Sequence, residues 1–329
     1  MHLSCANTFI NIHKETLKKM ISVKNLSKYF GDFCAVDDVS FAVQPGEILG
    51  FLGPNGAGKS TTMKMLTGFL NPTSGTVDVM GFDVDKRPVE AKRQLGYLPE
   101  GAPAYADMTV KASLEFVGKI RGFAGAELEE RVARVVRQVE LEKVLGKRVE
   151  TLSKGYQRRL GLAQAILHDP KVLILDEPTD GLDPNQKHQV RELIRNLSKD
   201  KIVIVSTHIL EEVSAVCTRA MILAEGRILF DGTPEELAAK SEYHNSVHIH
   251  VAGADDALRE QLSEIASVSK VERTEAGGLR VLSSERTPIL AEVNSILHAS
   301  GCQIDELHVE QGKLDDVFRT ITGRQEVAR

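Results

Sequence analysis

The chain has 329 residues, a length that suggests two domains, or one large domain with an appendage. With 42% hydrophobic and 26% charged residues it has the composition of an average globular protein, which excludes disordered, collagen-like and low-complexity classes. The net charge of −5 does not indicate the large positive surface that extensive nucleic-acid binding requires. We therefore expect no nucleic acid among its partners.

The cysteine pattern and the N-terminus indicate a cytoplasmic protein. The four cysteines lie far apart, and no two form a CxxC pair: Cys5, Cys34, Cys217 and Cys302. No stretch approaches the ~20 apolar residues of a membrane span. Residues 1–19 carry lysines after their apolar residues, the reverse of a signal peptide. We expect an N-terminal extension at 1–19, either upstream of a natural start at Met20 or an ordinary N-terminal arm.

Residues 20–245 have the pattern of an α/β domain with two inserted subdomains. Short β-rich runs at 21–26, 35–43 and 47–52 are separated by turn residues, which predicts an antiparallel sheet leading into a core strand. Between 109 and 167 apolar residues recur at helical spacing, which predicts a helical insert. Strand, helix and strand then follow from 171 to 205, the order typical of a parallel sheet.

A polar stretch at 240–245 marks the predicted boundary with a second domain, residues 246–329. The apolar pattern after it indicates strand, helix, a hairpin around Gly277 and Gly278, a second helix, a strand and a last helix. This β-α-β-β-α-β order predicts an α+β ferredoxin-like domain. His244, His248 and His250 fall near or in its first strand, where they alternate with apolar residues as an outer face would, so the sequence does not favour a metal site there.

The first chemical motif is a phosphate-binding loop of the form GxxxxGK[ST]. It reads Gly53-Pro54-Asn55-Gly56-Ala57-Gly58-Lys59-Ser60 and is followed by Thr61. Backbone N–H groups of such a loop surround phosphates, Lys59 reaches the β and γ groups, and Ser60 ligates Mg²⁺. An apolar run precedes the loop and a helical pattern follows it, as this mechanism requires.

The second motif is an apolar strand that ends in two carboxylates, Asp176 and Glu177. Parallel sheets present the ends of their strands to the ligand crevice. Asp176 is in the position to hold Mg²⁺ through its waters, and Glu177 to polarise the attacking water. The two motifs together predict binding and hydrolysis of a nucleoside triphosphate.

An ordered set of motifs over residues 20–240 resembles the ABC ATPases. It comprises the phosphate loop, Leu152-Ser153-Lys154-Gly155-Tyr156-Gln157 before the acidic strand, Asp180-Gly181-Leu182-Asp183 after it, and His208 at the end of the next strand. The resemblance implies a P-loop NTPase core and a head-to-tail homodimer with ATP between the phosphate loop of one subunit and the signature loop of the other. It further implies that Ser153 and Gly155 contact the γ-phosphate across the interface, that Asp183 links the two sites, and that His208 hydrogen-bonds the γ-phosphate.

Four further positions follow from the same resemblance. Phe30 is the candidate for stacking on adenine, with Tyr29 and a plain packing role as the alternatives. Lys154 and Tyr156 stand where the usual signature has glycine and glutamine. Glu100 replaces the loop glutamine that senses Mg²⁺ and the membrane subunit, and its carboxylate can bind a cation. With the sequence Leu314-Asp-Asp-Val317-Phe318 near the C-terminus, these departures resemble the branch of drug-export and gliding-motility ATPases.

The expected function is therefore that of an ATP-hydrolysing subunit, with ATP and Mg²⁺ as cofactors, that energises a separate integral membrane permease for export. The resemblance implies a cytoplasmic chain, peripheral on the cytoplasmic face of the inner (plasma) membrane. ABC ATPases of DNA repair or translation usually carry a long coiled-coil insert, zinc cysteines or tandem cassettes, which this sequence lacks. A non-hydrolysing nucleotide-binding regulator is expected to lack Glu177 or Lys59. Residues 246–329 are expected to regulate the ATPase, to stabilise its dimer, or to be a passive extension.

Overall fold

The computed structural model describes residues 20–251, 256–274 and 277–323, so the predicted extension at 1–19 lies outside the described residues. The chain divides into two compact units, the first ending at Asp231 and the second beginning at Gly232. The division lies earlier in the chain than the boundary that the sequence suggested after residue 245. The difference arises because α9 (Pro234–Ala238) packs against α12 (Leu314–Thr322), near the C-terminal end, and so belongs to the second unit.

An antiparallel sheet forms the first layer of unit 1. Its order is β2-β1-β4-β5, with bounds β1 (Ile21–Phe30), β2 (Phe33–Val43), β4 (Ser74–Val79) and β5 (Phe82–Asp83). Gly31 at φ +58° begins the two-residue turn that pairs Phe30 with Phe33. The predicted antiparallel sheet is confirmed, although β4 escaped the sequence pattern because its six residues include Ser, Gly and Thr and show no clear alternation.

The second layer of unit 1 is a six-stranded sheet of order β10-β9-β3-β8-β7-β6. Its bounds are β3 (Ile48–Leu52), β6 (Leu95–Leu98), β7 (Val172–Asp176), β8 (Ile202–Thr207), β9 (Arg219–Ala224) and β10 (Arg227–Gly232). The five strands from β9 to β6 are parallel, which confirms the predicted parallel sheet. The carboxyl ends of β3, β7 and β8 consequently lie at one edge.

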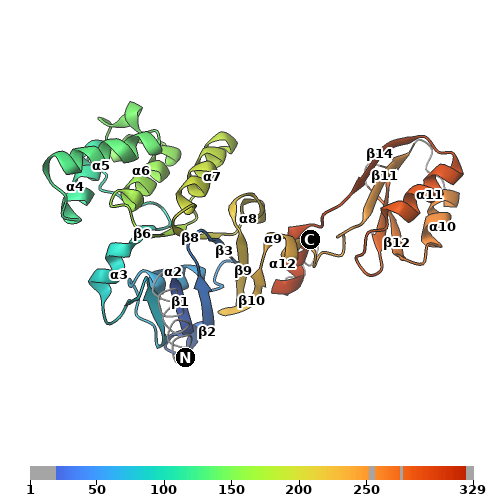
Figure 1. The fold of residues 1–329 in the computed structure, drawn as a ribbon, viewed down its shortest axis with the longest axis horizontal. Coiled ribbons are helices and arrows are strands. Elements are labelled where there is room, and N and C mark those ends of the chain that lie inside the picture. Colours follow the sequence, from blue (N-terminus) through green and yellow to red (C-terminus); the bar gives the residue numbers. More distant parts are fainter. Residues whose placement is uncertain (1–19, 252–255, 275–276, 324–329) are drawn as a thin grey trace, which may run out of the picture. The chain divides into compact units, whose positions relative to one another are not determined.

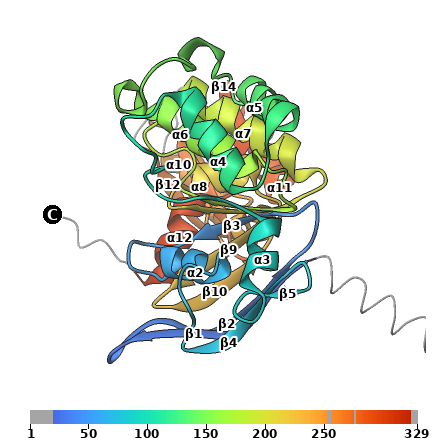
Figure 2. The ribbon, with the colours of Figure 1, turned by 90° about the vertical axis from the view of Figure 1, so that its left-hand side faces the viewer.

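Both faces of this parallel sheet are buried, because alternate residues of its strands enter two different cores. In β7, Leu173 and Leu175 pack into a core with the helical layer, whereas Val172 and Ile174 pack into a core with the antiparallel sheet. Figures 1 and 2 show these layers on opposite sides of β3, β8 and β9. The helical layer contains α4 (Val110–Ile120), α5 (Gly125–Gln138), α6 (Lys154–Ile166) and α7 (Pro184–Ser198).

The remaining helices of unit 1 connect these layers. Helix α2 (Lys59–Leu66) follows β3 and packs into the core shared with the antiparallel sheet, as does Ala91 of α3 (Pro88–Gln94). Helix α8 (Leu210–Val216) follows β8 and contacts α7. Two short 3-10 turns, at Glu142–Val144 and Val149–Thr151, lead from α5 to α6. Helices α2 and α8 are thus the helices that follow the neighbouring parallel strands β3 and β8 in the chain.

Unit 2 has the ferredoxin-like topology that the sequence predicts. Its sheet order is β12-β13-β11-β14, every neighbouring pair is antiparallel, and apolar residues of the sheet and of two helices form one core. The bounds are β11 (Val247–Val251), α10 (Asp256–Ser263), β12 (Val268–Arg273), β13 (Leu279–Ser283), α11 (Leu290–Ser300) and β14 (Ile304–Val309). The β11–α10–β12 unit therefore encloses β13, the split arrangement of this fold.

The approach of β6 to α6 generates a test of packing. A Cβ added at Gly96 would lie 2.2 Å from the carbonyl oxygen of Ala165, whereas one at Gly146 would meet no atom within 4 Å. We expect Gly96→Ala to lower the free energy of unfolding by about 1–3 kcal/mol, since backbone must move to admit the methyl group. Urea unfolding followed by circular dichroism measures the change. Gly146→Ala is the control, and equal midpoints for the two variants would contradict the close approach.

Candidate functional site

Steric contacts explain the glycines of the phosphate loop, which joins β3 to α2. Gly58 has φ +102°, and a Cβ there would lie 2.5 Å from the carbonyl oxygen of Ala35. A Cβ at Gly53 would lie 2.3 Å from the carbonyl oxygen of Leu223. Gly56 adopts φ +83°, a conformation that favours glycine. The loop can therefore keep this shape only with glycine at positions 53, 56 and 58.

A cleft of about 240 Å³ opens beside this loop. It collects most of the residues that the sequence predicts for nucleotide binding, together with Phe33 and Ala35. Its walls are formed by Phe30, Phe33, Ala35, Pro54, Asn55, Gly56, Gly58, Lys59, Ser60, Thr61, Glu100 and Glu177. Gly53 and Ala57 belong to the loop but not to these walls.

Lys59 is the cation at the centre of the site. Its side chain lies largely inside the protein, 7% exposed, and Nζ donates hydrogen bonds to the carbonyl oxygens of Gly53 at 2.6 Å and Pro54 at 3.2 Å. Burial lowers the pKa of Lys59, while the charges of Glu177, Asp176 and Glu100 act in the opposite direction. Glu100 and Glu177 line the same cleft as Lys59, and Asp176 is the residue before Glu177.

Two aromatic side chains stand at the open end of the cleft. Phe30 is 50% exposed and Phe33 is 63% exposed, and both line it, whereas Tyr29 does not. Lys28 Nζ lies 5.3 Å from the ring centroid of Phe30. Sequence reasoning missed Phe33, although the two-residue turn at 31–32 was a usable signal, because such a turn places the flanking residues opposite each other.

The acidic strand end is held by the neighbouring strand β8. The hydroxyl of Ser206 donates a hydrogen bond to the Oδ1 atom of Asp176, which is buried. The backbone N–H of Glu177 donates to the carbonyl oxygen of Ser206 at 3.1 Å, and Glu177 itself adopts φ +49°. These bonds hold the end of β7 against β8, at the same edge of the sheet as the start of the phosphate loop.

Glu177 and His208 contact each other directly. Nδ1 of His208 lies 3.0 Å from each carboxylate oxygen of Glu177. Burial raises the pKa of Glu177, and the hydrogen bond from His208 only partly offsets this effect. The pair joins the ends of β7 and β8 within hydrogen-bond distance, the geometry that a general base and an orienting group require.

Glu212 lies behind this pair, and sequence reasoning did not identify it. Its carboxylate is 4% exposed and accepts hydrogen bonds from the hydroxyls of Thr207, at 3.1 Å, and Thr179. Nζ of Lys187 on α7 lies 3.7 Å from Oε1 of Glu212. The two threonines belong to the segments that carry His208 and Glu177, so one buried carboxylate ties both segments together.

The structure does not bring Ser153, Gly155 and Asp183 to this cleft within one chain. Ser153 caps α6 by accepting a hydrogen bond from the N–H of Tyr156 at 3.4 Å, and Asp183 caps α7 by accepting from Gln186 at 2.9 Å. A Cβ at Gly155 would lie 2.5 Å from Oε1 of Gln186, so the two helix N-termini are neighbours. They form a second cluster in the same unit.

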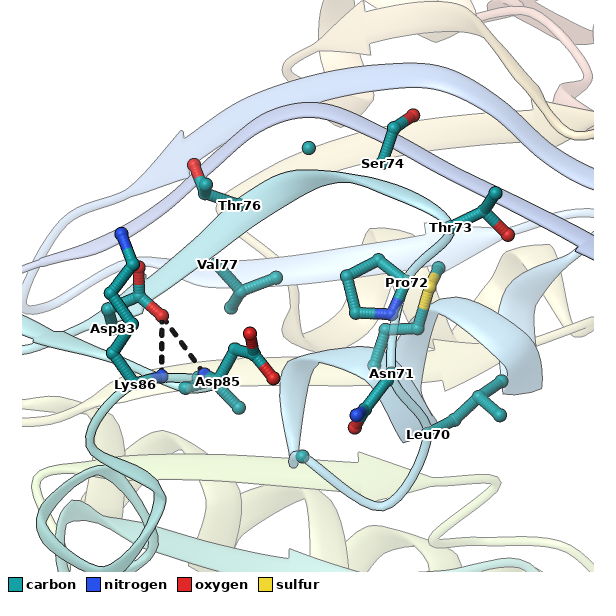
Figure 3. A pocket seen from close by; sticks show the side chains of 14 residues that line it. Leu70, Asn71, Pro72, Thr73, Ser74, Thr76, Val77, Asp83, Asp85 and Lys86 are labelled. Carbon is teal, nitrogen blue, oxygen red and sulfur yellow. Dashed lines mark hydrogen bonds and ion pairs between the residues drawn. The ribbon is translucent and has the colours of Figure 1, made fainter.

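Another cavity of unit 1, of about 270 Å³, lies between the end of α2, β4 and the loop before α3 (Figure 3). Oδ1 of Asp83 accepts hydrogen bonds there from the N–H groups of Asp85 and Lys86, each at 3.0 Å. Because that carboxylate is already satisfied and none of the motif residues lines this cavity, we assign it no chemistry.

Comparison with known proteins agrees with this geometry. The model of the ABC transporter family matches residues 36–180. Nod factor export ATP-binding protein I of Cupriavidus metallidurans is 36% identical over 308 residues, which cover 93% of this chain and 98% of that protein. Linearmycin resistance ATP-binding protein LnrL of Bacillus subtilis is 30% identical over 307 residues, 93% of this chain and 99% of that protein.

A solved structure agrees as well. The dimeric structure of a bacterial ABC transporter cassette is 25% identical, with a TM-score of 0.60, and the match covers 65% of this chain and 98% of that one. Within the described residues, no helix has both the length and the apolar character needed to cross a membrane. Motifs, fold and relatives over nearly the whole length agree, and the chain belongs to the ABC transporter family as an ATP-binding, ATPase subunit.

Proposed function

We propose that this ATPase subunit energises export through a separate integral membrane permease, from the cytoplasmic face of the inner membrane. The relatives that align over nearly its whole length are named for export and for resistance, which supports the outward direction. ABC cassettes dimerise and act with a membrane component. The observation that carries the catalytic part of the proposal is that Lys59, Glu100 and Glu177 line one cleft, with Glu177 in contact with His208.

The donor set of the cleft fits a magnesium nucleotide. The N–H groups of the glycine loop and the Lys59 ammonium suit the β- and γ-phosphates, and Phe30 with Phe33 offers apolar rings to the base. The oxygens of Ser60, Asp176 and Glu100 are the ligand type that Mg²⁺ prefers. Bound there, the ion would neutralise charge on the phosphates.

Glu177 acts as the base that orients and polarises the attacking water in this proposal. Its carboxylate is partly buried, which raises its pKa above that of an exposed glutamate. His208 holds the carboxylate from one side and is in position to donate to a γ-phosphate on the other. Glu212 holds the two segments together by accepting hydrogen bonds from Thr207 and Thr179.

The second cluster completes the site in a head-to-tail homodimer. Ser153 is exposed at the N-terminus of α6, which has its hydroxyl and free N–H groups available to an anion of a second subunit. Gly155 follows it in the first turn, and Asp183 lies beside it on the neighbouring helix end. In this arrangement each subunit supplies the phosphate loop of one site and the signature loop of the other.

Lys59 tests nucleotide binding. We expect Lys59→Ala to weaken ATP binding by at least tenfold, because it deletes a charge-assisted contact to the phosphates. Fluorescence titration with a labelled ATP analogue measures the affinity. Lys64→Ala on the exposed side of the same helix is the control and should bind as the parent does. Equal affinities for all three proteins would exclude Lys59 from the site.

Glu177 tests the chemical step. We expect Glu177→Gln to keep ATP binding and to lower steady-state ATPase activity by about 10²–10⁴-fold, since the amide keeps the shape and loses the base. Phosphate release is the measurement, and the exposed Glu211→Gln serves as control. Undiminished turnover in Glu177→Gln would refute the role of this carboxylate.

Ser153 tests the dimer. In the Glu177→Gln background ATP should produce a dimer on size-exclusion chromatography, and Ser153→Arg should abolish it by placing a long side chain in the interface. Nucleotide titration should still detect binding, because the phosphate loop is intact. Ser295→Arg, an exposed serine of the second unit, is the control. An ATP-dependent dimer that survives Ser153→Arg would show that this loop lies outside the interface.

The permease itself is tested by purification from membranes. A tagged Glu177→Gln chain should co-purify from detergent-solubilised membranes with an integral membrane protein, identified by mass spectrometry. Recovery of only this chain from the membrane and soluble fractions would contradict the coupling to a permease.

A further inference from the structure

The second unit brings together three potential metal ligands that lie far apart in the sequence. His248 on β11 and His308 on β14 are directly opposite each other in the antiparallel register. Glu306 lies two residues before His308 on the same strand, so its side chain leaves the sheet on the same face. The apolar residues that flank His248, Val247 and Ile249, enter the core with the helices. The three polar side chains therefore share the opposite, outer face.

The distances within this group are close to those of a coordination sphere. One ligand atom of each residue lies within 4.8 Å of the ligand atoms of the other two. Ligands bound to a tetrahedral Zn²⁺ at 2.0–2.2 Å are about 3.4 Å apart, so modest side-chain rotation brings all three into range. The rings of His248 and His308 are stacked, with centroids 4.8 Å apart, and Nδ1 of His308 lies 3.1 Å from Oε1 of Glu306.

The hydrogen-bond pairing of the group also favours a cation. Nδ1 of His248 is buried and has no hydrogen-bond partner among the described residues, so one ring nitrogen is unsatisfied. Arg280, opposite His248 on β13, is the nearby positive group, and its guanidinium is neutralised by Glu310 at 2.8 Å.

We propose that His248, His308 and Glu306 form a binding site for a divalent transition metal of the Zn²⁺ class on the outer face of the second unit's sheet. Two imidazoles and one carboxylate are a common ligand set for such ions and leave a coordination position for water. Because β14 is an edge strand and β11 is its interior neighbour, the bound ion links the edge strand to the rest of the sheet. His244 and His250 lie outside the group.

This site could not be inferred from the histidines of β11 alone. Their alternation with apolar residues is what any half-buried strand shows, and His308 and Glu306 are more than fifty residues away in the sequence. Only the pairing of β11 with β14 places them beside His248. The proposal is independent of nucleotide binding and rests on the second unit only.

The experiment uses the full chain after EDTA treatment, without nucleotide. Isothermal titration with Zn²⁺ should give one equivalent bound in the parent, and Co²⁺ should produce visible absorption from the same site. His248→Ala and His308→Ala should each lower the Zn²⁺ affinity by at least about 100-fold, since each removes a ligand outright and even outer-shell changes cost 10–100-fold. Glu306→Gln, which keeps the shape, should weaken binding as well.

His298→Ala on the exposed part of α11 is the control and should bind Zn²⁺ as the parent does. Thermal unfolding in EDTA, expected to be the same for all variants, verifies that they fold, and Zn²⁺ should raise the melting temperature only of the parent and the control. Absence of Zn²⁺ binding by the parent would overturn the proposal. Equal binding by the parent and a His248→Ala/His308→Ala double variant, which would locate the ion elsewhere, would also overturn it.

Discussion

Parallel pairing of β3, β7 and β8 is the constraint on which the catalytic geometry depends. Neighbouring parallel strands end at the same edge of their sheet, so the phosphate loop after β3, the carboxylates after β7 and His208 after β8 meet at one place. The pairing is possible because both faces of the sheet are covered and each strand can be apolar throughout. The helical layer and the antiparallel sheet therefore contribute to catalysis indirectly, by keeping water away from both faces.

Buried charge at this edge is balanced by contacts between segments. Lys59 shares the walls of one cleft with Glu100 and Glu177, and the Asp176 carboxylate accepts a hydrogen bond from Ser206 of the neighbouring strand. The Glu212 carboxylate accepts hydrogen bonds from the hydroxyls of Thr179 and Thr207, which lie in the segments that carry the Glu177–His208 pair. A buried carboxylate that loses its partners destabilises its surroundings by several kcal/mol, so these bonds restrict how far the two segments can separate. The same restriction keeps the Glu177 carboxylate beside His208.

The second unit has a different organisation. Helices cover one face of its sheet, and none of the unit's described helices packs on the other, outer face. The strands accordingly alternate apolar and polar residues. Cross-strand pairs on that outer face, such as His248 with His308, consist of residues distant in the chain. Such pairs are fixed by register, since a shift of one residue would turn every side chain to the other face.

The sequence by itself determined the features that depend on local spacing: the phosphate loop, the acidic strand end, His208, the parallel and antiparallel sheets, and the ferredoxin-like order of the second unit. These were predictable because glycine sterics, strand alternation and helical periodicity act within a few residues. Tertiary structure decided the rest. Phe33 reaches the cleft through hairpin register, Glu212 through the packing of α8 and α7, and α9 joins the second unit through contact with α12. The turn at 31–32 is a local signal for Phe33, but Glu212 and α9 depend on residues that approach only when the chain folds, and no local pattern encodes those contacts.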